Sequence, residues 1–358
     1  MPSEYPAEPL YDSPWPDRTP HGTVPGRGMA PRVPNLRATG DGKYHPLQRR
    51  RDGELWPAAA TLQLSRQKFM TRKKGRAAVG KTAALFFPFD LFGSAGTSKG
   101  AELLADAFRE MLADNQRERL ATRADAYAGK VRVQELRLDT LVAYQKWRES
   151  ARLAVRRAWQ RQEFVLWVTG NHLGVLPLYE ELGTRAADTL VVQFDAHLDI
   201  YNLSDCTPEL SHGNFLLHAT EPLPAIINLG TRELLLRHDH VRRYYRQAFP
   251  ADRLTIDPEP ALRTLAQACE AASGVFLDID CDVFDPAFFP AVANPLPFGL
   301  DPPLFLRLLN AAWSKKVMGV AISEFDPGRD RNDQSLALLV WLLEYLLLRR
   351  YEGFGTYA

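Results

Sequence analysis

The stretch from Leu190 to Asp199 reads LVVQFDAHLD and indicates the fold class of the chain. Its first half is apolar apart from one glutamine, as expected for a strand buried on both faces of a parallel sheet. Its second half places two carboxylates and one imidazole at alternate positions. In open parallel sheets, ligands bind beyond the carboxyl ends of the strands. The stretch therefore predicts an α/β protein with a polar site at one edge of its sheet.

Further apolar runs are expected to form strands, and amphipathic segments between them are expected to form helices. The expected strands, besides Leu190–Phe194, are Ala83–Phe87, Phe164–Val168, Ala225–Leu229, Gly274–Leu277 and Val317–Ile322. The expected helices are Lys99–Asp114, Leu138–Arg161, Val175–Leu182, His238–Gln247, Pro260–Ala272, Pro303–Ser314 and Gln334–Arg349. This alternation predicts a single three-layer α/β/α domain over residues 81–358, with a mainly parallel sheet in the middle.

Residues 1–80 have a different composition. Eleven of the 26 prolines lie in the first 60 residues, and residues 1–80 hold 14 basic and 7 acidic side chains, a net charge of +7. Such a segment has too little apolar surface to offset the entropy of ordering, which predicts a flexible or surface-lying N-terminal extension. The rest of the chain carries −6, so the overall charge of +1 hides this asymmetry. The basic segment Arg66–Lys81 is interpreted as a solvated linker, with binding to nucleic acid or an acidic partner as the alternative, so nucleic-acid binding is not expected.

The cysteines and the apolar runs indicate the cellular compartment in which the protein is expected. The three cysteines share no metal-binding spacing and are odd in number, so a disulfide framework is not expected and a reducing cytoplasm is predicted. The apolar run Leu336–Leu348 is interrupted by Glu344 and is shorter than the roughly 20 residues that span a bilayer. The sequence shows no secretory signal pattern. We therefore predict no membrane association.

Polar residues follow three other expected strands, in the segments Thr169–His172, Asp278–Pro286 and Ser323–Pro327. Alternate residues of an extended chain face one side, so Asp278, Asp280 and Asp282 project together, as do the alternate residues of DAHLD. Carboxylates crowded on one face raise one another's pKa unless a cation lies among them. Imidazole and carboxylate without thiolate suit Mn, Zn, Fe, Co or Ni, and the number of ligands favours two metal ions.

Four segments resemble the signature segments of the ureohydrolases, the family of arginases, agmatinases and formimidoylglutamases. They are Thr169–His172, Asp195–Asp199, Asp280–Pro286 and Ser323–Pro327. The resemblance runs from about Phe86 to the C-terminus and includes Phe87–Asp90 followed by Gly100–Glu102. It implies an arginase-like fold with a binuclear manganese centre, two Mn²⁺ ions being expected and Ni, Co, Fe or Zn being alternatives.

The resemblance also implies the ligands of each metal. One ion would be held by His172, Asp195, Asp199 and Asp280, and the other by Asp195, His197, Asp280 and Asp282. Asp195 and Asp280 would bridge the two ions. A water shared by both ions would then have a lowered pKa and would attack the carbon of a guanidino group.

The catalytic and substrate-binding residues are likewise carried over from the resemblance. Glu324 would pair with the guanidinium, Asp199 would pass a proton to the departing amine, and His212 would act as a proton shuttle. Glu233 falls where arginases keep an acid that faces the substrate's amino group, and Asn202 is a further candidate contact.

Two departures from the family pattern bear on specificity. Tyr201, Pro208 and Leu210 stand where arginine-hydrolysing members hold the substrate's carboxylate, so free L-arginine is not the expected substrate. An agmatine-like amine or the arginine side chain of a peptide fits better. Asp278 stands where the family usually has a small hydroxyl residue, and it would act either as a protonated donor behind the metals or through altered metal preference.

The leading interpretation is a metal-dependent hydrolase of linear amidines that releases urea. The alternatives are a formimidoylglutamase-like amidine hydrolase, a zinc deacetylase on a related fold, and a metal-binding arginase-like protein without catalysis. A homo-oligomer is expected, as in the family that the chain resembles.

Overall fold

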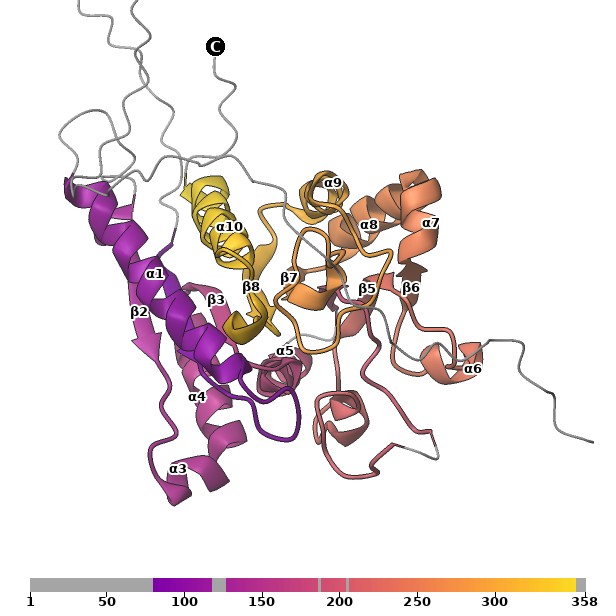
Figure 1. Ribbon diagram of the computed structural model, residues 1–358, viewed down its shortest axis with the longest axis horizontal. Helices are drawn as coiled ribbons and strands as arrows, with labels where there is room; N and C mark the ends of the chain where they lie inside the picture. Colours follow the sequence, from indigo (N-terminus) through magenta and orange to yellow (C-terminus); the bar gives the residue numbers. More distant parts are fainter. Residues whose placement is uncertain (1–79, 118–126, 186–187, 204–205, 352–358) are drawn as a thin grey trace, which may run out of the picture. The chain divides into compact units, whose positions relative to one another are not determined.

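The computed structural model describes residues 80–117, 127–185, 188–203 and 206–351 (Figure 1). The predicted N-terminal extension lies outside the described residues, apart from Gly80. The described residues form an eight-stranded parallel sheet in the order β2-β1-β3-β8-β7-β4-β5-β6. The strands are β1 (Thr82–Phe87), β2 (Val131–Glu135), β3 (Phe164–Thr169), β4 (Thr189–Phe194), β5 (Ala225–Thr231), β6 (Gln247–Pro250), β7 (Gly274–Asp280) and β8 (Val317–Ser323).

Helices cover both faces of this sheet, which confirms the three-layer α/β/α architecture (Figure 1). One face packs against α1 (Thr97–Arg117), α7 (Ala251–Ile256), α8 (Glu259–Ala271), α9 (Pro302–Ala312) and α10 (Gln334–Tyr351). The other face packs against α4 (Trp147–Gln160) and α5 (Leu176–Arg185). Two short helices, α3 (Leu141–Gln145) and α6 (His238–Val241), complete the α-helices of the described residues, which also form 3-10 helices at His172–Val175, Phe215–His218, Cys281–Val283 and Pro327–Arg329. None of the helices in these ranges has the length and apolarity needed to cross a membrane.

The alternation of side chains along β4 and β7 brings acidic residues to one face. Leu277 and Ile279 of β7 pack in the core beneath α8 and α9, so Asp278, which lies between them, faces the α4 and α5 layer. In β4, Val192 and Phe194 pack on that same core, which leaves Gln193 on the opposite face. The two strands are neighbours. Their carboxyl ends therefore deliver the acids that follow them to one place.

Six strands were expected from the sequence, and all six are confirmed. The edge strands β2 and β6 were not predicted, nor was α7. The helix predicted over His238–Gln247 is wrong beyond Val241, where α6 ends. The chain then turns, the amide of Arg246 donates to the carbonyl of Ile226, and β6 pairs with β5. Tertiary pairing thus overrides the local helical pattern.

The helix predicted over Leu138–Arg161 is divided in the structure. It forms α3 and α4, which meet at Lys146, where the backbone leaves the helical region at φ −106° and ψ 18°. The remaining expected helices are present with shifted ends. Cys281 was expected to pack in the core, and it is fully buried among apolar residues on the α8 and α9 side.

Candidate active site

A cluster of buried carboxylates surrounds the imidazole of His172. Its Nδ1 atom lies 2.7 Å from Asp199 Oδ2, 3.2 Å from Asp195 Oδ2 and 3.2 Å from Asp280 Oδ2. Within the described residues, three of these buried atoms have no hydrogen-bond partner: His172 Nδ1, Asp195 Oδ2 and Asp199 Oδ2. Buried polar atoms without partners are rare because they are costly. Their convergence fits a cation held among them.

A second group of ligand atoms adjoins the first. His197 Nδ1 lies 2.8 Å from Asp282 Oδ2. The ligand atoms of Asp195, His197 and Asp282 lie within 4.8 Å of one another, and the same holds for His172, Asp195 and Asp199. Because Asp195 belongs to both groups, the arrangement fits two neighbouring cations that share a carboxylate. Hard oxygen donors and imidazoles are suitable ligands for divalent transition metals.

The pKa values of the side chains in the cluster are shifted in the direction expected where positive charge is lacking. Burial, followed by the charge of Asp199, raises the pKa of Asp195 to about 8. Burial and the neighbouring Asp282 raise the pKa of Asp280 well above its ordinary range. Burial lowers the pKa of His197, but Asp282 outweighs it and brings that pKa to about 10. The raised pKa values of Asp195, Asp280 and His197 show that added positive charge would stabilise this group of buried side chains.

The backbone fixes the carboxylates and leaves one oxygen of each free. Asp195 Oδ1 accepts a hydrogen bond from the amide of His197 at 2.7 Å, and Asp280 Oδ1 accepts one from the amide of Asp282 at 3.0 Å. Their Oδ2 atoms point toward His172. Each of the two carboxylates is therefore anchored on one side and offers its other oxygen to the cluster.

Two of the expected catalytic residues have left-handed backbones. Asp199 has φ +49° and Glu324 has φ +63°. A residue with a side chain in this region costs about 1–3 kcal/mol and persists where its surroundings fix it. The amide of Glu324 donates to the carbonyl of Gly170 at 2.7 Å, which links the ends of β8 and β3. The strained backbone thus directs both side chains into the site.

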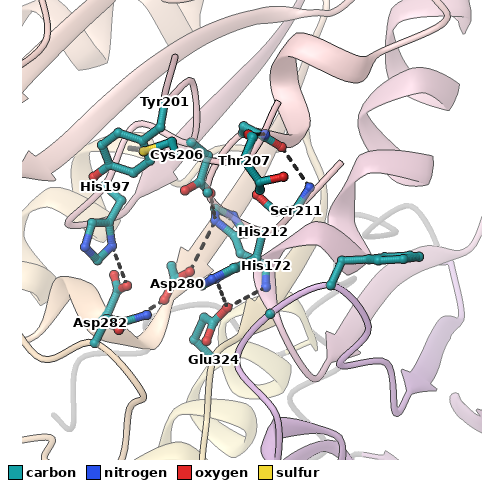
Figure 2. Close-up of a pocket in the computed structure, with 16 residues that line it drawn as sticks. His172, His197, Tyr201, Cys206, Thr207, Ser211, His212, Asp280, Asp282 and Glu324 are labelled. Carbon is teal, nitrogen blue, oxygen red and sulfur yellow. Dashed lines mark hydrogen bonds and ion pairs between the residues drawn. The ribbon is translucent and has the colours of Figure 1, made fainter. Parts of the chain in front are cut away.

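Glu324 lies between the cluster and His212, as Figure 2 shows. Its Oε1 accepts a hydrogen bond from the amide of His172 at 2.9 Å and lies 3.5 Å from His212 Nδ1. The same nitrogen lies 3.1 Å from Ser94 Oγ. Burial lowers the pKa of His212, but the contact with Glu324 outweighs it and raises that pKa. His212 therefore lies beside a buried acid that favours its protonated form.

The loop after β1 contributes to the site and was not predicted to do so. The carbonyl of Phe92 accepts a hydrogen bond from the amide of His212 at 3.2 Å. Asn171 Nδ2 donates to the carbonyls of Leu91 and Gly93 at 2.8 and 2.9 Å. The family resemblance found in the sequence covers Phe87–Asp90 and Gly100–Glu102, and Ser94, which contacts His212, lies between these two segments. The small residues at 93–96, in the loop that follows β1, were the available signal for a tightly placed loop.

A pocket of about 430 Å³ opens over the cluster. Beyond the cluster, Glu324 and His212, it is lined by Phe92, Gly93, Tyr201, Cys206, Thr207, Ser211, Gly213, Asn214 and Asn294 (Figure 2). None of the described residues that line it is a lysine or an arginine. Asn294 was missed by the sequence reasoning, because nothing in its surrounding sequence marks it.

The structure places two of the expected substrate contacts away from the pocket lining. The Glu233 carboxylate accepts from the amide of Leu235 at 2.9 Å and bonds to the hydroxyl of Tyr201. Burial and this bond raise the pKa of Tyr201 well above its ordinary value. Among the described residues, Tyr201 connects Glu233 to the pocket. Asn202 lines a neighbouring cavity together with Leu236 and other residues, and it does not join the cluster.

Comparison with known proteins identifies the family. Residues 81–348 match the family model described as Arginase: Arginase family. The chain belongs to the arginase family. Among similar curated proteins, the agmatinase of Photorhabdus laumondii is 28% identical over 184 residues, which are 50% of this chain and 58% of the agmatinase. The N(1)-aminopropylagmatine ureohydrolase of Thermus thermophilus is 29% identical over 211 residues, 54% of this chain and 67% of that protein.

Solved structures of the arginase family share the fold. A hypothetical agmatinase from Burkholderia thailandensis superposes with a TM-score of 0.62 at 20% identity, covering 76% of this chain and 86% of that one. Arginase from Bacillus subtilis gives a TM-score of 0.60 at 18% identity, covering 75% and 98%. These matches confirm the arginase-like α/β/α fold. The match to the curated agmatinase, in contrast, spans little more than half of that protein's length.

Proposed function

We propose that this member of the arginase family is a metal-dependent ureohydrolase that cleaves a guanidino group into urea and an amine. The observation that carries the proposal is the Glu324 carboxylate, which is 4% exposed and lies between the acidic cluster and His212. A planar guanidinium donates paired hydrogen bonds to a carboxylate. No described lysine or arginine in the pocket lining competes for this acid. A cationic guanidino group is therefore the complementary ligand.

The donor set supports two divalent metal ions, for which we propose manganese, with Ni, Co, Fe and Zn as alternatives. His172, Asp195, Asp199 and Asp280 would hold one ion, and Asp195, His197, Asp280 and Asp282 the other. When bound, such ions supply Lewis acidity and lower the pKa of water. The shared position of Asp195 and the partnerless atoms of the cluster support this assignment.

The chain's own residues would orient the substrate and move protons. Glu324 would hold the guanidinium in register with the cluster, because its carboxylate is fixed by the amide of His172. Asp199 Oδ2, at the edge of the cluster, would hold a proton released in hydrolysis and pass it to the departing amine. His212, whose pKa is raised, would exchange a proton between the pocket and Glu324.

We propose an agmatine-like amine as substrate, with the arginine side chain of a peptide as a further candidate. The described lining of the pocket lacks a cation that would pair with the carboxylate of free arginine. Tyr201 and Glu233 form a polar pair at its side that suits an amine better. Similarity to proteins named agmatinase and N(1)-aminopropylagmatine ureohydrolase supports the same substrate class.

A substrate panel with the manganese-loaded full chain tests the proposal. Urea, ammonia and formamide are measured separately with agmatine, N(1)-aminopropylagmatine, free arginine, an arginine-containing peptide and formimidoyl-glutamate. We expect urea from one of the amines, and a kcat/KM for agmatine about 100-fold above that for free arginine. Equal values for these two would contradict the substrate assignment. Formamide and glutamate from formimidoyl-glutamate would support the amidine hydrolase, because water then cleaves the bond between the amidine carbon and the departing amine, and no turnover at full metal loading would support a binding protein. A homo-oligomeric state and a cytoplasmic location stay predictions.

A further inference from the structure

Asp278 lies directly behind His172, on the side of the ring opposite the acidic cluster. Its Oδ2 atom is 2.9 Å from His172 Nε2. The other ring nitrogen, Nδ1, faces Asp195 and Asp199. Asp278 is fully buried and His172 is 2% exposed, so water does not compete for this contact. The imidazole is thus held between one carboxylate behind it and several in front.

A chain of buried side chains fixes the role of Asp278 as an acceptor. The Tyr179 hydroxyl donates to Asp278 Oδ2 at 2.5 Å. Gln193 Nε2 donates to that hydroxyl at 3.4 Å, and Asn228 Nδ2 donates to Gln193 Oε1 at 3.0 Å. All four residues are fully buried, and they come from β5, β4, α5 and β7. As a carboxylate, Asp278 can only accept, so we take the hydrogen of its contact with His172 to come from Nε2.

This polarity determines the tautomer of His172. If Nε2 carries the hydrogen that Asp278 accepts, then Nδ1 of the neutral ring presents its lone pair to Asp195 and Asp199. A lone pair facing carboxylate oxygens is repelled unless a cation lies between them. A metal-binding histidine whose other nitrogen donates to a carboxylate is fixed in orientation and is a stronger ligand.

We propose that Asp278 is a positioning residue that sets the tautomer and the metal affinity of His172. The inference goes beyond the ligand set and rests on the metal centre of the proposed function. The family resemblance places a small hydroxyl residue at this position, and a serine side chain, one atom shorter and uncharged, would not keep the 2.9 Å contact. Asp278 therefore gives this chain a stronger ligand for the metal on the His172 side than a hydroxyl would give.

The test compares metal binding by the full-length wild type, Asp278→Ser and Asp278→Asn. Metal-free protein is titrated with Co²⁺, whose visible spectrum reports the ligand field, and Mn²⁺ affinities are measured by competition with a chelator. We expect two sites in the wild type. In Asp278→Ser, the affinity of one site falls about 10–100-fold, while the site held by His197 and Asp282 changes less. Asp278→Asn keeps an acceptor oxygen without the charge and should lie between the two.

Glu180→Gln is the matched control. Glu180 is another fully buried carboxylate, on α5 next to Tyr179, but it accepts from Arg148 and Thr220, away from the cluster. This variant should lose stability and keep both metal affinities and the Co²⁺ spectrum. If Glu180→Gln weakened metal binding as much as Asp278→Ser, the effect would be general destabilisation and the proposal would be overturned.

Wild-type affinities and spectrum in Asp278→Ser would also overturn it. If Asp278→Ser does not fold, the nearly isosteric Asp278→Asn decides alone, and wild-type affinity in that variant would be the contrary result. The titrations need no substrate, so a failure of this inference is distinguishable from a failure of the proposed ureohydrolase activity, which the substrate panel measures.

Discussion

Gly93 lies against the imidazole ring of His212, so closely that a methyl group at position 93 would be 2.0 Å from Cδ2 of that ring. The backbone of Gly93 has φ +144°, a conformation that other residues rarely adopt. The carbonyl of the preceding Phe92 also accepts a hydrogen bond from the amide of His212. The loop after β1 and the segment of His212 are therefore held together, and neither can move aside alone.

The first prediction follows from this contact. Gly93→Ala should displace His212 and lower kcat about 100-fold, because a misplacement of about 1 Å has an effect of that size. Bound metal should stay unchanged, since His212 is not among the proposed ligands. Steady-state kinetics and metal analysis of the same preparation measure both. Gly129→Ala is the control, because Gly129 also has a positive φ of +66° but a methyl group there would meet no atom of the described residues within 4 Å. Full activity in Gly93→Ala would show that the contact is unimportant.

The second prediction concerns the proposed partner of the guanidinium. Glu324→Gln removes the charge of a buried carboxylate, and kcat/KM should fall about 100-fold or more, as for other buried charge pairs. Metal content should match the wild type. Asp326→Asn provides the control two residues away, since Asp326 accepts from the amide of Gly328 and from Arg329 in a turn. A parallel loss in both variants would assign the effect to the loop instead of the carboxylate.

The third prediction concerns metal removal. Cations would satisfy the atoms of the cluster that lack partners, so Mn²⁺ should raise Tm and a chelator should lower it. At a free metal concentration 100 times Kd, the stabilisation is about 2.7 kcal/mol per site. Differential scanning calorimetry of wild type and Asp282→Asn measures the shift. The variant should lose much of the shift, because Asp282 and His197 lie on one side of the cluster. An identical shift in Asp282→Asn would count against Asp282 as a ligand.

The fourth prediction concerns pH and the buried carboxylate of Glu180. Burial raises its pKa, but hydrogen bonds from Arg148 and Thr220 outweigh it, and the pKa is lowered from 4.5. The stability from this group is therefore present above pH 4.5 and is lost as the pH falls through the lowered value. Glu180→Gln should cost about 3 kcal/mol at pH 7. The difference from wild type should shrink in acid.

Urea unfolding at a series of pH values measures this difference. Asp239→Asn is the matched control, since the pair of Asp239 with Arg237 is exposed and should leave the urea midpoint unchanged. A difference between wild type and Glu180→Gln that stayed constant down to low pH would contradict the assigned linkage.

The central strands could be predicted from the sequence because burial on both faces makes their sequences almost continuously apolar. The edge strands could not. In β2, VRVQE is partly exposed along its length, and β6 has only four residues, so neither shows the pattern of a buried strand. The helix predicted over His238–Gln247 was too long for the same reason. Gln247 belongs to the edge strand β6, and its pairing with Ile227 is set by tertiary contacts that the local sequence does not show.

The ligand candidates of the site could be predicted because they follow strand ends and alternate along extended chain. The residues that hydrogen-bond to the side chains of the site, and so hold them in place, could not be predicted. Ser94 lies 118 positions from His212, and Tyr179 lies 99 positions from Asp278, and no local pattern records such contacts. The placement of Asn202 could not be predicted either, because adjacent residues in a loop, here Tyr201 and Asn202, need not face the same cavity.

The strand order has a consequence for synthesis of the chain on the ribosome. β7 and β8 lie between β3 and β4, although they are made last. A nascent chain that ends before Gly274 holds two separate groups of strands, with the edges of β3 and β4 open. Such edges can pair with other chains until β7 and β8 fill the gap between them. Asp280, Asp282 and Glu324 lie at or after the ends of these two strands, so the proposed metal site is complete only once β7 and β8 have been made.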